Sequence, residues 1–592
     1  MRSGLKSIVT IVSAVFMLTS VSLSAQNDWI DATHLFDDEV RGVVSSLKRE
    51  TRENTIVRNR AMAPIERSIQ IGDTHTFWTK NIVENRFEET RAVLKAVGKN
   101  CYVFLEAGKT LTAEAIEKVR KNFDEIIYPA NTRNFGSEWK PGIDGDDKIT
   151  LLLFDVKDGY NGSGGFVGGY FYAVDCYLQE KIPEHLKSNE REMIYLDINP
   201  SDPASDRFAN TVAHEFQHMI HFNQDSSEYT WVNEACSQIA PYLCGFGHAN
   251  QVVSFMRTPD NSLTAWAKEQ MLANYGQVYL WNYYILHRFL REDDAARTTF
   301  FKNLVASKKQ GVAGYVEALS SISKSFTSTF DKFCLANYLN DERAGKGEFG
   351  YDKSLARLKL PVSETVSVLP AEISGEVFLW SADAVKIELK NARSDIKLSF
   401  KGFRGKMGED QYNSFTVALA LLDSTGKIPP RISYFDIAPL SSKLQGGNLT
   451  ITPPDSFDSA MLIIVAQADE EVDDRVYAKA QPMKYSVKIS DAGSAVVRAS
   501  SSVEIQELVA DYALTSERLG EAGEAEAMIA LDRLENTRRI LAEELLTQLE
   551  NNENNVFAVI DEMLASGQVA LNAIEPLLKD LNDTARFRSV NR

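Results

Sequence analysis

Cysteine is scarce in this chain, with five residues in 592: Cys101, Cys176, Cys236, Cys244 and Cys334. So small and odd a number argues against a disulfide framework, although it leaves room for one or two pairs. No two cysteines show the CxxC spacing, which argues against a cysteine-held structural zinc module. Histidine is also rare, at eight residues. A histidine pair at a ligand spacing therefore carries weight.

Positive charge and long apolar runs are limited as well. Lysine and arginine number 64 against 82 aspartates and glutamates, a formal net charge of −18. An acidic surface repels phosphate, so nucleic acid is not expected as a partner. After residue 25 no apolar stretch is long enough to cross a bilayer. With 44% hydrophobic and 25% charged residues, the chain has the composition of a soluble globular protein.

The first 25 residues predict a secretory signal peptide. Arg2 and Lys6 precede an apolar run over 8–23, and the small residues of 22–25 offer a cleavage point. We therefore expect a secreted, periplasmic or cell-envelope protein, with no transmembrane span once 1–25 has been removed. An uncleaved membrane anchor is the alternative, but the run is short and rich in serine and threonine.

The length of the chain suggests two to four domains. Residues 26–64 are charged and weakly periodic, and could form a propeptide, a linker or the start of the next domain. Strand patterns followed by a long helix at about 206–223 predict an α+β domain over 65–350. Short alternating segments separated by turn residues predict an all-β sandwich at 360–491. Leucine, alanine and glutamate dominate 500–592, which predicts an α-helical C-terminal region.

Several elements of the α+β domain can be placed. The strands expected from apolar runs are 69–83, 100–105, 148–154 and 192–197. Gly162 to Tyr172 mixes glycines with aromatic residues, which predicts an edge strand or a β-bulge. Thr112 is the expected N-cap of a helix over 111–127.

The segment His214-Glu215-Phe216-Gln217-His218 carries the strongest chemical signal. Histidines four residues apart share one helix face, so both imidazoles can reach one metal at about 2.1 Å. Glu215 has the position of a general base that takes a proton from metal-bound water. The pattern predicts a catalytic zinc site, against the alternative of two histidines that only pack or face solvent.

A catalytic zinc needs a third protein ligand and an open position. His221 shares a helix face with His214, but seven residues of helix separate them by about 10 Å, too far for one metal. Glu234, in the segment WVNE, is the better candidate because the preceding loop could turn a second helix back to the metal. Asp225 and Glu228 are weaker alternatives, since they lie close to the end of the first helix.

The stretch TVAHEFQHMI at 211–220, with WVNE at 231–234, resembles the hyicolysin-type neutral metallopeptidases and, more broadly, the gluzincins. The resemblance implies a zincin-like α+β fold with Glu215 catalytic. It also implies a zinc ion held by His214, His218 and Glu234.

The resemblance extends over about 69–340 and is best over 194–284. One departure is Cys236, which stands where an aliphatic residue is expected two positions after the glutamate. The substitution removes no ligand, but it leaves the shape of the pocket open. A thiol near the site could also be sensitive to oxidation.

Tyr275, in Asn274-Tyr275-Gly276-Gln277, is the candidate electrophile that stabilises the oxyanion of the reaction. Enzymes similar to this family use a downstream tyrosine or histidine in that role, and Tyr279 and His287 follow it. Because Tyr275, Tyr279 and Tyr283 are spaced four apart, they could instead be core residues.

Calcium is a second candidate cofactor, because aspartates crowd one turn. They are Asp144, Asp146 and Asp147, with Asp155 and Asp158 nearby. Oxygen ligands at such spacing suit calcium, although a full EF-hand pattern is missing and a solvated turn is the alternative.

Together these features predict an exported zinc metalloendopeptidase that hydrolyses proteins or peptides, with Glu215 as the general base. One alternative is an exported adhesion or scaffold protein with a degenerate, non-catalytic peptidase domain. Another is a zinc enzyme that acts on a non-peptide bond. A third is a latent peptidase in which 26–64 covers the cleft.

Overall fold

The computed structural model describes residues 29–46, 69–266, 270–389, 395–407, 411–470 and 482–491, with single residues and one short helical run between 509 and 581. The chain divides into two compact units, 1–391 with 398–488 and 392–397 with 489–592. The expected signal peptide and most of the expected helical C-terminal region lie outside the described residues. Among the helices that are described, none has the length and apolar character needed to cross a membrane.

A seven-stranded sheet forms the base of the α+β region, in the order β1-β6-β7-β5-β4-β3-β2. The strands are β1 (Trp29–Asp31), β2 (Thr74–Asn81), β3 (Arg86–Val97), β4 (Cys101–Glu106), β5 (Ile149–Phe154), β6 (Phe166–Tyr170) and β7 (Met193–Asp197). The central strands β4, β5 and β7 run parallel, and nearly all of their residues are buried. Strands covered on both faces are continuously apolar, which is why these three were predictable.

Strand β3 was not predicted, because its first half is polar and partly exposed. Residues 162–172 were predicted to form an edge strand or a β-bulge. The edge strand is wrong, but the pairing of β6 with β1 has the register shift of a β-bulge or a similar irregularity. Strand β6 lies there, but it has β7 on one side and β1 on the other. Strand β1 pairs with β6 in parallel, and the register shifts between Ile30 and Asp31. The segment 26–64, whose role the sequence left open, thus contributes a strand to the sheet.

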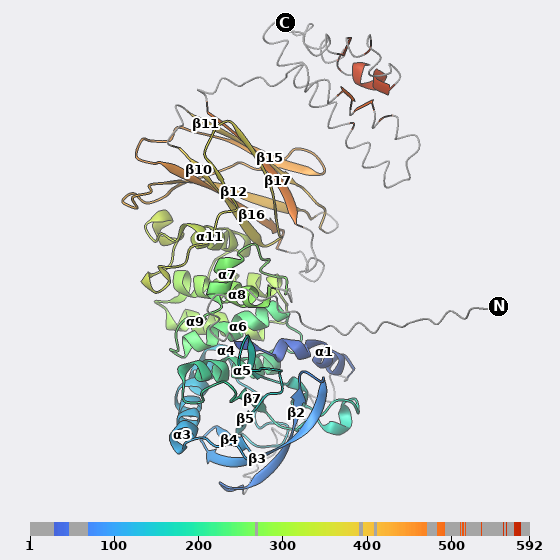
Figure 1. Cartoon of the computed structure of the whole chain (residues 1–592), viewed down its shortest axis with the longest axis vertical. Coiled ribbons are helices and arrows are strands. Elements are labelled where there is room, and N and C mark those ends of the chain that lie inside the picture. The colour runs from blue at the N-terminus through green and yellow to red at the C-terminus, as the bar shows by residue number, and fades with distance from the viewer. Residues whose placement is uncertain are drawn as a thin grey trace, which may run out of the picture. The chain divides into compact units, whose positions relative to one another are not determined.

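Helices lie against the sheet and continue beyond it (Figure 1). They are α1 (Asp37–Ser46), α3 (Ala113–Lys121), α4 (Tyr128–Phe135), α5 (Asp206–Gln224), α6 (Thr230–Leu243), α7 (Val252–Arg257), α8 (Met271–Ile285), α9 (Asp294–Ala306), α10 (Val312–Ser320) and α11 (Phe326–Leu339). Shorter 3₁₀ or π segments are η1 (Thr33–Phe36), η2 (Asn122–Ile127), η3 (Ala173–Cys176), η4 (Gln179–Lys181), η6 (Leu286–Leu290), η7 (Ala344–Gly347) and η8 (Lys353–Leu355).

Hydroxyl side chains cap the N-termini of helices α3 and α5. Thr112 caps α3, as predicted, by accepting a hydrogen bond from the Ala115 amide at 3.1 Å. Ser205 caps α5 in the same way through the Phe208 amide. Helix α5 lies between the sheet, where it contacts β6 and β7, and helix α6 (Figure 1). All residues from Thr211 to Phe222 are therefore buried.

Two five-stranded sheets follow in the region where a β-sandwich was predicted. Their orders are β13-β12-β16-β10-β8 and β14-β15-β11-β17-β9. The strands are β8 (Glu364–Val366), β9 (Ala371–Val377), β10 (Ser381–Glu388), β11 (Ile396–Phe403), β12 (Asn413–Leu422), β13 (Arg431–Tyr434), β14 (Ala438–Pro439), β15 (Leu444–Ile451), β16 (Ser459–Ala468) and β17 (Met483–Asp491). Phe400 and Phe415, from different sheets, pack ring to ring at 5.3 Å.

Strand β16 is buried along its whole length, unlike the alternating β11. Its sheet is covered on one face by the second sheet, and helix α11 packs against β16. A strand enclosed on both faces loses the alternation of polar and apolar residues, and the run Ala460–Ala466 is apolar throughout for this reason.

Candidate metal centre

Two histidines of α5 face one point. His214 and His218 are four residues apart on one helix face, and their Nε2 atoms are 3.0 Å apart. Both side chains are essentially inaccessible to solvent, because α5 is enclosed by the sheet and by α6. Two buried imidazole nitrogens that converge in this way form a ready pair of metal ligands.

Helix α6 brings Glu234 to the same point. A short turn after α5 reverses the chain, and the two helices pack along their length. Glu234 Oε2 lies 3.4 Å from His214 Nε2 and 3.5 Å from His218 Nε2. This carboxylate is 1% exposed, and its Oε2 accepts no hydrogen bond from the described residues. A buried carboxylate oxygen in that state fits a cation better than a purely structural role.

A fourth group comes from β1, far upstream. Asp31 Oδ2 lies 3.6 Å from His218 Nε2 and 3.8 Å from His214 Nε2, and the side chain is fully buried. Burial acts to raise the pKa of Asp31, but the side chains of His214, His218 and His34 outweigh it and hold this pKa well below its usual range. Asp31 was not predicted from the sequence, because a single aspartate in a three-residue strand gives no spacing signal.

These four groups fit a tetrahedral zinc ion. Ligand bonds of about 2.0–2.2 Å place neighbouring donor atoms about 3.4 Å apart in a tetrahedron. The two histidine Nε2 atoms lie 3.0 Å from each other and 3.4 to 3.8 Å from the nearest carboxylate oxygens of Glu234 and Asp31. Imidazole nitrogens and carboxylate oxygens are also the donor set that zinc accepts. The residues therefore fit the metal that the motif predicts.

Glu215 lies beside this donor set, and its Oε2 accepts a hydrogen bond from Thr33 Oγ1 at 2.9 Å. The side chain is fully buried. Burial first, and the charge of Asp31 second, raise the pKa of Glu215 well above its usual range. A carboxyl group with a raised pKa can hold a proton and release it, as a general acid–base group must.

Tyr275 of α8 also reaches the centre. Its hydroxyl lies 2.9 Å from His34 Nδ1, 3.3 Å from the main-chain oxygen of Asp31 and 3.4 Å from Asp31 Oδ2. Burial, followed by the nearby carboxylates, raises the pKa of Tyr275 well above its usual range, so the hydroxyl stays a donor. The Trp266 ring packs edge-on against Tyr275 and fixes its orientation.

The two side chains expected behind Tyr275 lie elsewhere. The Tyr279 hydroxyl is 2.6 Å from Nδ1 of His248. Nε2 of His287 lies 3.5 Å from Oε1 of Glu342, and its Nδ1 lies 3.6 Å from Oδ2 of Asp352. Among tyrosines of α8 with a described hydroxyl contact, Tyr275 is the one that faces the donor set.

The other candidate ligands of the first helix and its loop do not join the donor set. His221 is buried and lacks hydrogen-bond partners among the described residues, and burial lowers its pKa to about 3. Asp225 accepts a hydrogen bond from Ser227, and Glu228 accepts one from the Gly311 amide. These residues therefore help to shape the turn between α5 and α6.

The aspartates considered for calcium mostly close turns. Asp146 accepts hydrogen bonds from the Tyr102 hydroxyl and the Lys148 amide. Asp155 pairs with Lys109 at 2.7 Å. Within the described ranges, groups of three or more close potential ligands occur around Asp31 and not at this turn. Calcium at this position stays a prediction.

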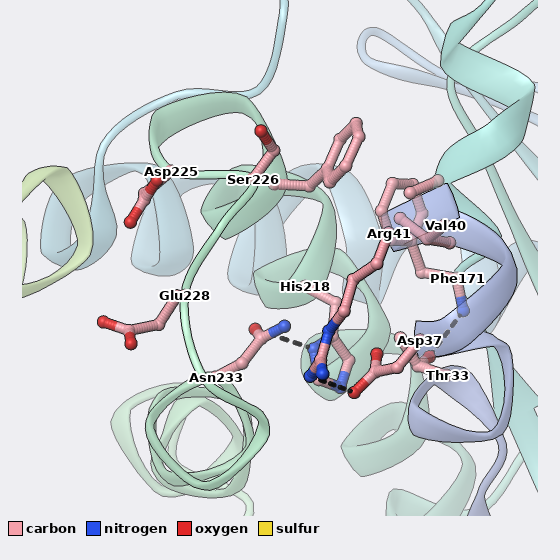
Figure 2. A pocket seen from close by; sticks show the side chains of 12 residues that line it. Thr33, Asp37, Val40, Arg41, Phe171, His218, Asp225, Ser226, Glu228 and Asn233 are labelled. Carbon is pink, nitrogen blue, oxygen red and sulfur yellow. Dashed lines mark hydrogen bonds and ion pairs between the residues drawn. The ribbon is translucent and has the colours of Figure 1, made fainter. Parts of the chain in front are cut away.

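A small pocket of about 50 Å³ opens beside His218, between α1 and the turn from α5 to α6 (Figure 2). Thr33, Asp37 and Arg41 line it on one side, and Asn233 and Glu228 line it on the other. The N-terminal segment thus forms one wall of the space next to the donor set.

Comparison with known proteins gives one informative match. No family model matches the chain. The chain is 28% identical over 235 residues to the neutral metalloprotease ShpI of Staphylococcus hyicus, covering 36% of this chain and 52% of that protein. It thus matches about half the length of this relative. The similarity supports a relationship to metallopeptidases.

A match to the solved structure of a family GH115 4-O-methyl-α-glucuronidase covers 66% of this chain and 64% of the glucuronidase chain. Its TM-score of 0.12 at 9% identity carries no argument about the fold.

Proposed function

We propose that the chain is an exported zinc-dependent endopeptidase that hydrolyses protein or peptide bonds. The observation that carries this proposal is the convergence of His214, His218 and Glu234 with Glu215 beside them. The similarity to ShpI supports the same class. Export rests on the signal-peptide pattern of 1–25, and the hyicolysin-type assignment rests on the motif.

In this proposal His214, His218 and Glu234 hold the zinc ion. When bound, the ion supplies a Lewis acid that lowers the pKa of water and polarises the scissile carbonyl. Glu215 takes the proton from the attacking water and passes it to the leaving amine. Tyr275 donates a hydrogen bond to the oxygen that becomes negative in the tetrahedral intermediate.

The deciding experiment compares the wild-type chain with Glu215→Ala at equal bound zinc. Casein hydrolysis is measured before and after limited trypsin treatment, with and without a chelator. We expect chelator-sensitive cleavage by the wild type and none by Glu215→Ala, although the variant keeps its zinc. Glu292→Ala, at a glutamate whose side chain is 86% exposed, is the matched control and should cleave like the wild type.

Equal cleavage by wild type and Glu215→Ala would refute the proposal, because the activity would then come from another site. Tight zinc binding without cleavage of any peptide would favour the adhesion protein or the non-peptide hydrolase instead.

A further inference from the structure

The edge of the sheet beside the donor set is covered by the chain's own N-terminal segment. Strand β6 would be the edge of the sheet without β1. The Ala32 amide donates to the Gly169 carbonyl oxygen at 3.2 Å, and the Phe171 amide donates to Thr33 Oγ1 at 2.9 Å. An extended peptide that adds to a free strand edge uses main-chain hydrogen bonds of the kind that Ala32 makes with Gly169. Residues 31–33 therefore occupy the place that a peptide substrate would use.

The same three residues engage the groups assigned to catalysis. Thr33 donates to Glu215, the proposed base. The main-chain oxygen of Asp31 faces the Tyr275 hydroxyl at 3.3 Å, as a scissile carbonyl oxygen would. A base and an electrophile engaged in this way are not available to a second peptide. Substrate binding therefore requires residues 31–33 to leave.

Asp31 also completes the metal's coordination. Three protein ligands leave a zinc ion one open position for water or substrate, whereas four protein ligands close the site. Asp31 Oδ2 lies within 3.8 Å of both histidine nitrogens, so it takes the fourth position. With Asp31 there, no position remains for the attacking water.

The segment is held by contacts outside the donor set. Phe36 packs edge-on against the rings of Tyr170 and Tyr172 at 5.2 and 5.3 Å. Glu39 forms an ion pair with Lys80 at 2.7 Å and accepts a hydrogen bond from Tyr172.

We propose that residues 29–46 form an autoinhibitory segment, which occupies the substrate groove along β6 and places Asp31 as the fourth ligand of the metal. This inference rests on the proposed peptidase function for its consequence, but its geometry can be tested without peptide hydrolysis. The occupant of the groove is a named part of this chain, and displacement of the segment exposes the metal.

The test uses the full chain as wild type, Asp31→Ala and Asp31→Asn. In the wild type the Thr33 amide donates a hydrogen bond to Asp31 Oδ1 at 2.9 Å. Asp31→Asn keeps an oxygen that can accept this bond, so this variant controls for misfolding in Asp31→Ala. Leu35→Ala is the matched control, since this side chain is 45% exposed and lies in the same segment outside the donor set. Three quantities are measured: zinc affinity by chelator competition, binding of a peptidyl hydroxamate as a zinc-directed probe, and casein hydrolysis.

Loss of a ligand should weaken zinc binding by about tenfold or more in both Asp31 variants. Loss of the inhibitory contact should strengthen hydroxamate binding by about tenfold or more at saturating zinc. The two quantities thus change in opposite senses, and Leu35→Ala should resemble the wild type in both. Casein hydrolysis should rise with hydroxamate binding.

Two results would overturn the inference. If both Asp31 variants leave zinc affinity and hydroxamate binding unchanged, Asp31 does not reach the metal. If they weaken zinc binding and also weaken hydroxamate binding, Asp31 belongs to the working site and does not inhibit it. If hydroxamate binding strengthens while no variant cleaves casein, the segment does cover the metal and the peptidase proposal is the part that fails.

Discussion

Nδ1 of His218 lies 3.0 Å from Oδ1 of Asn233, the residue that precedes Glu234 in α6. When Nδ1 donates this hydrogen bond, Nε2 keeps its lone pair and points it at the donor set. One α5–α6 hairpin therefore supplies three ligands and also selects the tautomer of one of them.

The first prediction concerns this contact. Asn233→Ala removes the partner of His218 Nδ1 and should lower zinc affinity by about 10–100-fold. Asn233→Asp keeps an acceptor at the same place and should lower it far less. Chelator competition on both variants measures the effect, and equal losses would show that the hydrogen bond does not orient the ligand.

The third ligand can be distinguished from its neighbours in the sequence. Glu234→Gln replaces an anionic ligand by a neutral one, so bound zinc should fall well below one ion per chain after dialysis. Glu228→Gln alters a buried glutamate that accepts a hydrogen bond from the Gly311 amide, and it should keep its zinc. Metal analysis of the two dialysed variants decides, and the reverse pattern would move the ligand to Glu228.

Tyr275→Phe removes one hydroxyl that faces the reacting centre. Loss of an oxyanion donor lowers kcat by about 10²–10³-fold, and we expect a fall of that size with bound zinc unchanged. Tyr279→Phe is the control, because the Tyr279 hydroxyl contacts His248 instead. If both variants keep the wild-type kcat, then Tyr275 is only a core residue.

Gly169 allows β6 to lie against α5. A Cβ atom at this position would come within 2.8 Å of Thr211 Cγ2 and of the Tyr195 carbonyl oxygen. Gly169→Ala should therefore lower the free energy of unfolding by about 1–3 kcal/mol. Gly42→Ala, where an added Cβ meets nothing within 4 Å, should not destabilise the chain. Urea unfolding of the two variants measures the difference, and equal stability would argue against this close approach.

Asp331 of α11 should make stability depend on pH. Its Oδ2 accepts a hydrogen bond from Thr416 of β12 at 3.0 Å, and burial raises its pKa to about 7 from an ordinary value of 3.8. Between these two values the unfolded chain has released the proton while the folded chain keeps it. Stability from this group is therefore complete below about pH 4 and is lost as the pH rises through 7.

Asp331→Asn mimics the protonated, neutral aspartic acid, so the variant should not lose stability as the pH rises through 7. At pH 8 the variant should be more stable than the wild type by about 1–2 kcal/mol, with the difference shrinking toward pH 5. Thermal unfolding of both proteins at pH 5 and pH 8 measures it. A difference that does not change with pH would show that Asp331 is ionised throughout this range.

Much of the site could be predicted because it depends on local spacing. Four residues separate His214 from His218 on any helix, so one face and one metal follow from the sequence alone. The loop and second helix that bring Glu234 back are also close in sequence. Buried parallel strands such as β5 were readable as continuous apolar runs.

The arrangement around the metal was decided by tertiary structure. Thr33 and Glu215 form a hydrogen bond across 182 positions, and no local pattern records a contact at that distance. Strand β1 has three residues, too few for an alternation to be visible. Its place depends on the free edge of β6 and on the electrostatic attraction between Asp31 and the buried imidazoles. The sequence alone therefore determined which residues could hold and use a metal. Only the packing of the N-terminal segment against β6 decided that Asp31 lies beside the histidine ligands and that Thr33 is hydrogen-bonded to Glu215.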